Sequence, residues 1–373
     1  MSDYQRLGDY IREVNVRNSE LKVTKPMGIN IDKRFMPSVA NVIGTDLSTY
    51  KMVCKNQFAC NLMHVGRDEK IPIAMHTDDN PIIVSPAYFV FEIIPVETHG
   101  RASLHNDNEL LPEYLMMWFR RAEFDRNAWF YTDADVRGGL DKKALMDMRL
   151  PIPSIARQCE IVEEYETLSR RIRLNEQMIA RLEETAQALY RKMFVEGVDK
   201  ENLPEGWRRG KIGDLFELQR GFDLPSQDRI DGDFPIYAST GIAEYHNAYK
   251  VEPPCVVTGR SGTIGEVFYV DKRCWPLNTT LWVKDFKNTP SFFVYYKLKE
   301  LELGKTVSGF AAVPTLNRND VHMMESSIPP TDLLVEFEGE MKVIHQRLSI
   351  SKQENEKLTE LQSLLLARMG KVK

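Results

Sequence analysis

"RLEETAQALYRKM", residues 181–193, is matched later in the chain by "KLTELQSLLLARM", residues 357–369, at an offset of 176 residues. The same offset aligns residues 140–153 with residues 316–329, and no gap is needed across the whole span. Similarity at a fixed offset indicates a duplicated structural unit. Because the duplicated span admits no insertion or deletion, we infer that its length is constrained by geometry.

Apolar residues in both copies recur at alternating spacings of 4 and 3, which is the heptad pattern of a coiled-coil seam. A helix that only covered its own domain would show a wider apolar stripe of period 3.6. Polar residues fall near both midpoints and can fix the register. The central seam residues are Ile172, Asn175, Ile179 and Leu182 in the first copy and Leu348, Ser351, Asn355 and Leu358 in the second.

The pattern predicts two long helices that pair with each other. Parallel pairing would also align the polar midpoints, but two equal units related by a pseudo-twofold axis run their helices in opposite directions. We therefore predict an α+β fold with two globular α/β domains in pseudo-twofold arrangement, separated by two long helices that form an antiparallel coiled coil. The predicted boundaries are 1–153 and 198–330 for the domains and 154–197 and 331–373 for the helices.

Helices of this length span on the order of 50 Å. They would hold two similar domains apart in inverted orientation. Duplex DNA can be read at two half-sites about one helical turn, roughly 34 Å, apart, so the predicted architecture suits a DNA-reading protein.

The stretch "PPCVVTGRSGTIGEVFYV", residues 253–270, has three spaced glycines beside a predicted strand. A phosphate-binding loop needs Lys and then Ser or Thr after its last glycine, but Gly265 is followed by Glu266. A dinucleotide site needs a helix there, whereas residues 267–270 favour a second strand. The first half has "VGRDEKIPIA" (65–74) opposite "TGRSGTIGEV" (258–267). We predict a hairpin in both halves, with Arg67 and Arg260 at its turn.

Composition excludes several classes of protein. The formal net charge of -5 and the pI near 5.9 give no overall basic surface, which counts against a simple nucleic-acid-binding protein. The five cysteines are scattered and form no C-x-x-C pair, so neither a disulfide framework nor a metal site is expected. The opening residues, MSDYQRLGDY, lack the blocks of a signal peptide, so we expect a cytoplasmic protein.

Longer stretches resemble the specificity subunits of type I restriction-modification systems. In the first half these are "GINIDKRFMPSVANVIGTDLSTYKMVCKNQFACNLMHVGRD" and "IIVSPAYFVFEI". In the second half they are "QRGFDLPSQDRIDGDFPIYASTGIAEYHNAY" and "VVTGRSGTIGEVFYV". With the two helices headed by LPIP and SIPP, the resemblance covers nearly the whole chain. The second globular part departs from the first in being about twenty residues shorter.

The resemblance implies that each globular part is a target recognition domain that reads one half of a split sequence in double-stranded DNA. It also implies that the helices dock two methyltransferase (modification) subunits and that restriction subunits join for cleavage. S-adenosylmethionine, ATP and magnesium are then expected on the partner subunits, and no cofactor or catalytic residue on this chain. Residues 252–255, Glu-Pro-Pro-Cys, miss the aromatic residue with which amino-methyltransferases stack a flipped base.

Arg67 and Arg260 are the leading candidates for DNA contact, because a guanidinium can fork onto guanine or clamp a phosphate. The candidates are Asn61, His64, Arg67 and Lys70 in the first half and Arg220, Ser239, Thr240, Arg260, Ser261, Thr263, Asn278 and Thr279 in the second. The alternative is a protein-interaction scaffold with two binding heads on a coiled coil and no role on DNA. A stand-alone nucleotide enzyme is remote, because the phosphate-loop residues are missing.

Overall fold

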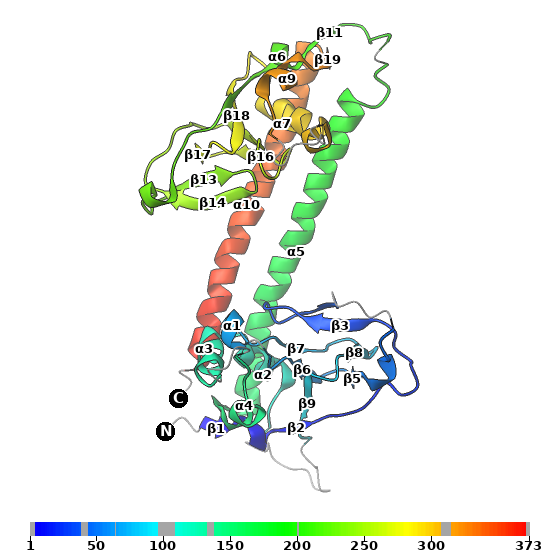
Figure 1. Cartoon of the computed structure of the whole chain (residues 1–373), viewed down its shortest axis with the longest axis vertical. Helices are drawn as coiled ribbons and strands as arrows, with labels where there is room; N and C mark the ends of the chain where they lie inside the picture. The colour runs from blue at the N-terminus through cyan, green and yellow to red at the C-terminus, as the bar shows by residue number, and fades with distance from the viewer. Residues whose placement is uncertain are drawn as a thin grey trace. The chain divides into compact units, whose positions relative to one another are not determined.

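The computed structural model describes residues 4–38, 44–63, 65–95, 109–132, 138–199, 201–306 and 315–370 (Figure 1). The chain divides into two compact units. Unit 1 contains residues 1–174 and 354–373, and unit 2 contains residues 175–353. Each unit therefore includes part of both long helices, α5 (Ile155–Phe194) and α10 (Thr331–Met369).

Unit 1 is built around a four-stranded antiparallel sheet of order β2-β9-β6-β7. A second four-stranded sheet has the order β4-β3-β8-β5, with β3 and β8 parallel. The strands are β2 (Ile11–Glu13), β3 (Pro26–Ile29), β4 (Phe35–Pro37), β5 (Lys51–Val53), β6 (Phe58–Cys60), β7 (Ile73–Met75), β8 (Ile82–Val84) and β9 (Phe89–Ile93). A two-stranded pair is formed by β1 (Tyr4–Arg6) and β10 (Arg149–Pro151).

Helices cover the first sheet of unit 1 and close its core. The core takes Phe58 and Phe91 from the sheet, Tyr114 from α2, and Ile161 and Met369 from the two long helices. The shorter helices are η1 (Leu7–Asp9), η2 (Leu47–Thr49), α1 (Val65–Asp68), α2 (Pro112–Phe119), α3 (Ala122–Phe130) and α4 (Lys142–Asp147). Because the long helices lend residues to this core, their packing belongs to the fold of the unit.

Unit 2 repeats this topology. Its main sheet has the order β12-β18-β15-β16, and its second sheet, β14-β13-β17, again has one parallel pair, β13 with β17. The strands are β11 (Arg208–Lys211), β12 (Glu217–Arg220), β13 (Phe234–Ala238), β14 (Gly241–His246), β15 (Cys255–Gly259), β16 (Val267–Val270), β17 (Trp275–Pro276), β18 (Thr280–Asp285) and β19 (Glu325–Ile328). The shorter helices are α6 (Ile212–Leu215), η3 (Ser226–Asp228), α7 (Ser291–Glu300), α8 (Leu303–Thr306) and α9 (Arg318–Met323).

The segment with the fixed offset of 176 residues has the same structure in both units. Helices α4 and α9 are each preceded by an N-cap residue, Asp141 or Asn317, whose side chain accepts a hydrogen bond from the backbone two residues later. Strand β11 pairs with β19 as β1 pairs with β10. The duplication inferred from the sequence is therefore a duplication of structure.

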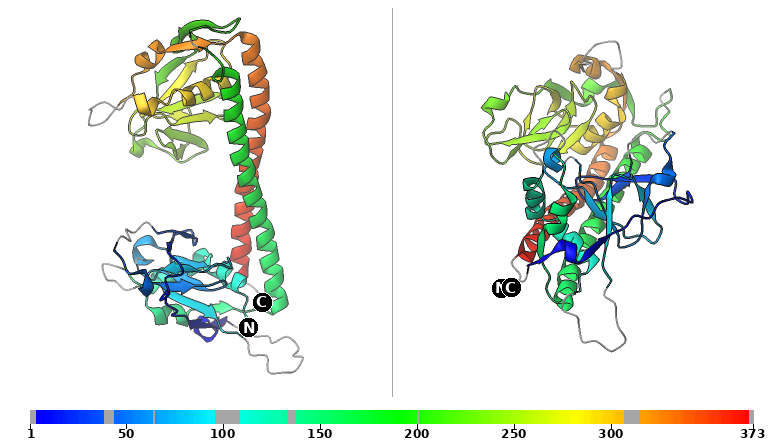
Figure 2. Two further views of the ribbon diagram at one scale, coloured as in Figure 1. Left: turned by 90° about the vertical axis from the view of Figure 1, so that its right-hand side faces the viewer. Right: turned by 60° about the horizontal axis from the view of Figure 1, so that its bottom comes forward.

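The long helices run antiparallel in each unit (Figure 2). In unit 1 the Arg171 guanidinium lies 2.7 Å from the Glu354 carboxylate, and in unit 2 Lys352 lies 3.1 Å from Glu183. The partner positions fall on one helix as they rise on the other, which only antiparallel segments allow. The predicted α+β fold class, with mixed α/β units and paired antiparallel helices, is confirmed.

In the part of the chain that the structure describes, no helix has the length and apolar character needed to cross a membrane.

Candidate nucleic-acid interface

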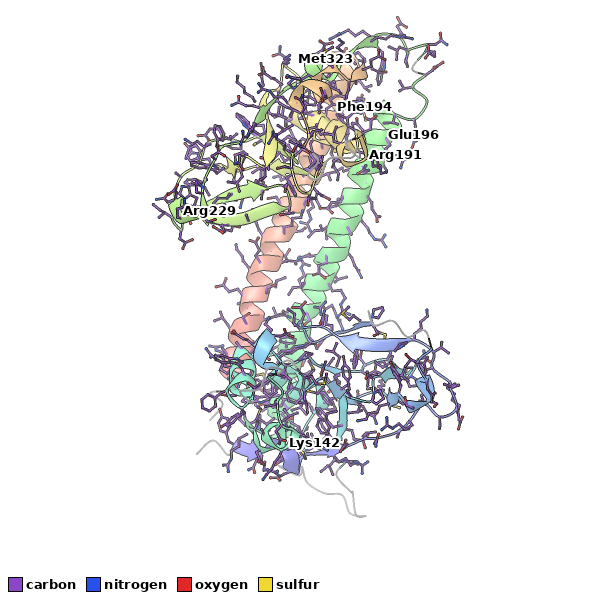
Figure 3. The ribbon with its side chains drawn as sticks, in the orientation of Figure 1. Lys142, Arg191, Phe194, Glu196, Arg229 and Met323 are labelled. Carbon is purple, nitrogen blue, oxygen red and sulfur yellow. The ribbon has the colours of Figure 1, made fainter. Side chains whose placement is uncertain are left out.

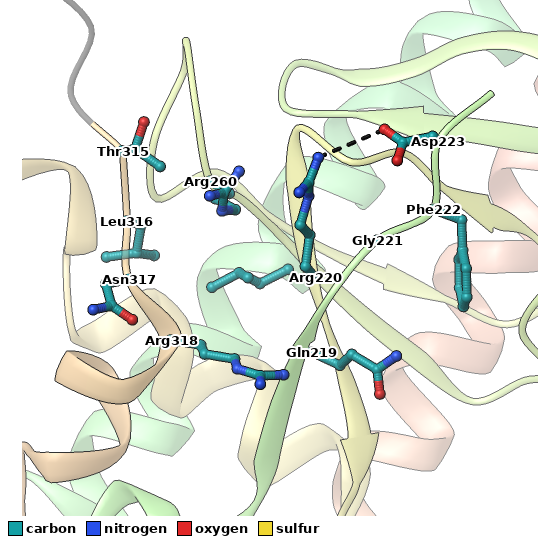
Figure 4. Close-up of a pocket in the computed structure, with 11 residues that line it drawn as sticks. Gln219, Arg220, Gly221, Phe222, Asp223, Arg260, Thr315, Leu316, Asn317 and Arg318 are labelled. Carbon is teal, nitrogen blue, oxygen red and sulfur yellow. Dashed lines mark ion pairs between the residues drawn. The ribbon is translucent and has the colours of Figure 1, made fainter. Parts of the chain in front are cut away.

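Arg220 and Arg260, both predicted to contact DNA, line one cavity of about 660 Å³ in unit 2 (Figure 4). Arg220 is the last residue of β12 and Arg260 directly follows β15, and these two strands flank β18 in the main sheet. A third arginine, Arg318, is the first residue of α9 and lines the same cavity. We call this site the arginine cavity.

Two glycines allow the backbone to form the walls of the arginine cavity. A Cβ on Gly221 would lie 2.2 Å from the carbonyl oxygen of Leu277, and one on Gly259 would lie 2.0 Å from that of Thr263. Real Cβ atoms do not approach carbonyl oxygens so closely. Glycine at these positions therefore lets the chains that carry Arg220 and Arg260 lie against neighbouring backbone.

The arginine cavity carries an excess of positive charge. Among its lining residues, Asp223 is the only carboxylate beside three arginines. Its Oδ1 lies 3.6 Å from Nη2 of Arg220 and also accepts a hydrogen bond from the Asn278 amide. Half of the Arg220 side chain, 53%, remains exposed. Exposed guanidinium groups with excess positive charge suit an anionic ligand.

The predicted hairpin of residues 253–270 is confirmed, since β15 and β16 pair antiparallel from Cys255↔Val270 to Thr258↔Val267. No helix follows the glycines, which excludes a dinucleotide loop. Gly262 and Gly265 adopt left-handed φ angles of 79° and 87° within the connection, so they serve the turn. Arg260 lies at the end of β15, beside the edge of the sheet, and not at the tip of the turn.

The corresponding connection in unit 1 has a different structure. Strands β6 and β7 pair antiparallel, as predicted, but the connection between them contains helix α1. Arg67 therefore lies in a helical turn, and the prediction that it occupies a hairpin turn like Arg260 was wrong. Lys70 follows α1 and is exposed, and Asn61 directly follows β6. His64 lies outside the described residues.

The remaining candidates of unit 2 surround the arginine cavity without lining it. The backbone amides of Arg260 and Ser261 both donate to the carbonyl oxygen of Thr279, which fixes the start of the hairpin connection. Ser239 is buried, with 9% exposed, whereas Thr240 and Thr263 are exposed. Their part in binding stays a prediction.

The sequence analysis missed four residues that the structure places at or near the candidate interface. Gln219, Asn317 and Arg318 line the arginine cavity. Arg318 had a signal, because the offset of 176 residues aligns it with another basic residue, Lys142. Lys33 had none: it is buried in unit 1, where Nζ lies 2.7 Å from Oδ1 of Asp125.

A second cavity of about 660 Å³ lies in unit 1, between α2, α3 and α4. Its charged lining residues include both acids and bases, Asp141 and Asp147 with Lys143 and Arg149. It contains no residue predicted to contact DNA. We therefore place the candidate interface of unit 1 at the β6–β7 connection and not at this cavity.

The seam of the long helices contains a buried polar layer in unit 2. Asn175 and Ser351 are both fully buried. Met178 fixes their register, because its sulfur accepts from Nε of Arg347 at 3.4 Å and lies 4.0 Å from Oγ of Ser351. Asn355 is half-buried in unit 1. Ile172, Ile179, Leu182, Leu348 and Leu358 are buried or half-buried.

The stretch that comes nearest to a methyltransferase motif is occupied by structural contacts. The Glu252 carboxylate lies 3.0 Å from the Arg273 guanidinium, and Cys255 is buried in β15. Burial raises the pKa of Cys255 further, together with its contact with Cys274. Within the described ranges no group of three His, Cys, Asp or Glu residues could hold a metal ion.

Comparison with known proteins identifies the class. Residues 204–363 match the family model described as type I restriction modification DNA specificity domain. The crystal structure of the type I restriction-modification S subunit from M. genitalium matches with a TM-score of 0.64 and 14% identity, over 99% of this chain and 96% of that one. A search of curated proteins finds no relative.

Two further solved structures are similar at lower TM-scores. One comes from work on complex assembly and conformational transition of the type I R-M system, with TM-score 0.48, 17% identity, and 98% and 96% of the two chains covered. The other is the HsdS subunit from Thermoanaerobacter tengcongensis, with TM-score 0.36, 16% identity and the same coverage.

The class is thus that of a DNA specificity domain. Residues 204–363 belong to the type I restriction-modification DNA specificity domain family, and the chain as a whole has the fold of a type I specificity subunit. The resemblance seen in the sequence is confirmed, and the subunits of this family are themselves non-catalytic.

Proposed function

We propose that this chain is the sequence-specificity subunit of a type I restriction-modification complex and reads a bipartite target in double-stranded DNA, with one unit for each half-site. The observation that carries the proposal is the repetition of one scaffold with unlike side chains. The main sheets have equivalent strand orders, but the connection after the third strand holds helix α1 in unit 1 and a glycine turn in unit 2. Equal scaffolds with different loops suit two different half-sites.

The arginine cavity supports DNA as the ligand of unit 2. Its guanidinium groups match the oxygen acceptors of phosphates and the N7 and O6 acceptors of guanine. The net charge of the chain is negative, so the positive charge is local. Local charge of this kind, with partner subunits that enclose the duplex, answers the objection raised by the low pI.

We further propose that the long helices dock two methyltransferase subunits and that restriction subunits join this complex. In unit 2 the exposed apolar residues Val335, Val343 and Ile350 lie on α10 at spacings of 8 and 7 residues, and therefore on one helix face. Such a face turned to solvent favours contact with a partner helix. S-adenosylmethionine, ATP and magnesium are assigned to the partner subunits.

Methylation mapping tests the proposal. DNA is treated with the complex of this chain and its methyltransferase subunits, and methylated positions are located by sequencing. The expected result is one split, asymmetric sequence with a modified base in each half. Absence of both a methylation pattern and a footprint on DNA, with assembled partners present, would contradict the proposal and favour the protein-interaction scaffold.

Substitution of Arg260 distinguishes reading by one unit from a global effect. We expect Arg260→Ala to relax or weaken recognition of one half-site only, by about 1–3 kcal/mol if the guanidinium reads a base. Equal loss at both half-sites would show that Arg260 does not act in one recognition unit.

A further inference from the structure

The two units differ in charge at one equivalent pair of positions. Strand β2 ends at Glu13 and its equivalent β12 ends at Arg220. Helix α4 begins at Lys142 and its equivalent α9 begins at Arg318. The same two places in the scaffold therefore hold an acid and a base in unit 1 but two bases in unit 2.

In unit 1 the two charges neutralise each other. The Lys142 ammonium donates to the Glu13 carboxylate in an ion pair. The Lys142 Nζ also lies 4.7 Å from the ring centroid of Phe89, so the side chain is held on both sides. Figure 3 labels Lys142 at the start of α4. This position in unit 1 has no free positive charge to offer a ligand.

In unit 2 the equivalent charges remain available. Among the described residues, Arg318 has no ion-pair partner, and Arg220 has only the distant carboxylate of Asp223. The neighbouring segment 307–314, VSGFAAVP, contains no carboxylate that could pair with them. Figure 4 shows that Arg220 and Arg318 reach the arginine cavity from different elements, with Arg260 beside them.

We propose that Arg220 and Arg318 clamp one phosphate of the DNA backbone, and that unit 1 lacks this anchor. The inference rests on the proposed function and deepens it. A phosphate is favoured over a base because its oxygens can accept from two guanidinium groups at once, whereas a guanine edge is read by a single fork. Unit 2 then supplies a sequence-independent part of the affinity that unit 1 does not supply at this position.

The test converts unit 2 into the charge pattern of unit 1. Arg220→Glu places a carboxylate at the position equivalent to Glu13, where it should pair with Arg318. Binding of the full chain, assembled with its methyltransferase subunits, is measured with a duplex of random sequence and with the mapped target between about 50 and 200 mM salt. We expect the slope of log K against log salt to become shallower by about 0.9, the value for one lost phosphate contact.

Arg318→Gln should give the same change in slope by direct removal of one guanidinium. This second variant introduces no new charge, so it checks that the effect of Arg220→Glu comes from the lost anchor and not from repulsion of DNA. Both changes should weaken random and target duplexes by the same factor, because a phosphate contact is independent of sequence.

Unit 1 offers matched controls. Lys142→Gln should leave the slope unchanged, because the lysine is already neutralised. Glu13→Gln should release Lys142 and make the slope steeper. Thermal unfolding of each variant verifies that the fold is retained.

Two results would overturn the inference. One is an unchanged slope for Arg318→Gln, and the other is a loss of affinity confined to the mapped target, which would indicate base reading. Failure of the unsubstituted complex to bind any duplex would instead contradict the proposed function, so the two failures are distinguishable.

Discussion

Lys33 and Asp125 form a buried ion pair in unit 1, with Nζ 2.7 Å from Oδ1 and only 5% and 13% of the two side chains exposed. Asp125 also accepts a hydrogen bond from the backbone amide of Ile71, which follows Lys70. The pair thus ties the turn between β3 and β4, and the connection between β6 and β7, to helix α3. Burial lowers the pKa of Lys33, and the nearby Asp125 charge opposes this shift.

We expect Asp125→Asn to lower the free energy of unfolding by about 3–5 kcal/mol, because it leaves a buried ammonium without its counter-charge. The matched control is Asp79→Asn, which breaks the exposed pair of Lys55 and Asp79 and should cost less than about 1 kcal/mol. Urea unfolding measures both. Similar small losses for the two variants would show that Lys33 is not held by Asp125.

His345 makes unit 2 less stable in acid. It lies in α10 among the rings of Tyr269, Phe292, Tyr295 and Tyr296, and its Nε2 lies 3.0 Å from the Tyr296 hydroxyl. Burial, with a smaller effect of Lys352, lowers its pKa from 6.5 to about 4. Between these values the unfolded state binds more protons than the folded state, so stability falls as the pH falls.

The stability lost through His345 between pH 6.5 and 4 is about 3 kcal/mol as an upper limit. We expect His345→Gln to flatten this part of the pH profile while other carboxylates still titrate. The measurement is the urea midpoint of both proteins at pH 7, 5.5 and 4.5, chosen to span about the range between the two pKa values. Parallel profiles would show that His345 titrates alike in the folded and unfolded states.

Gly221→Ala tests the close backbone approach beside the arginine cavity. The new Cβ would lie 2.2 Å from the Leu277 carbonyl oxygen, so the strand must move, at a cost of about 2 kcal/mol or more. DNA affinity should fall with it, because Arg220 moves with the strand. Gly339→Ala is the control: this glycine lies inside α10 with open space around it, and alanine should stabilise the helix by about 0.5–1 kcal/mol. Opposite signs in thermal unfolding are expected, and equal signs would contradict the steric argument.

The buried layer at Ser351 predicts a contrast between two substitutions. Ser351→Ala removes only a hydroxyl and should change stability by less than about 1.5 kcal/mol. Ser351→Asp buries a charge in a fully enclosed position and should cost several times more. Urea unfolding distinguishes the two. A well-tolerated aspartate would mean that the helices separate there.

Much of the scaffold could be predicted because its signals are local. The alternation of apolar residues at spacings of 4 and 3 predicted α5 and α10, and glycine spacing followed by β-branched residues predicted the β15–β16 hairpin. The matching failed at Arg67, because a short helix can replace a turn without any change in the strands on either side. Residues such as Lys33 gave no signal, since their partners are distant in the sequence.

The sequence by itself determined the duplication, the paired helices and the family, because repeats and heptads are written in the order of the residues. Only the tertiary structure decided which side chains meet: Arg220, Arg260 and Arg318 around one cavity, and Glu13 with Lys142 at the equivalent place. Strand register and backbone approach bring these residues together across gaps of 40 or more positions. The charge of a surface depends on such neighbours, so two halves with one scaffold can present different charges to the same ligand.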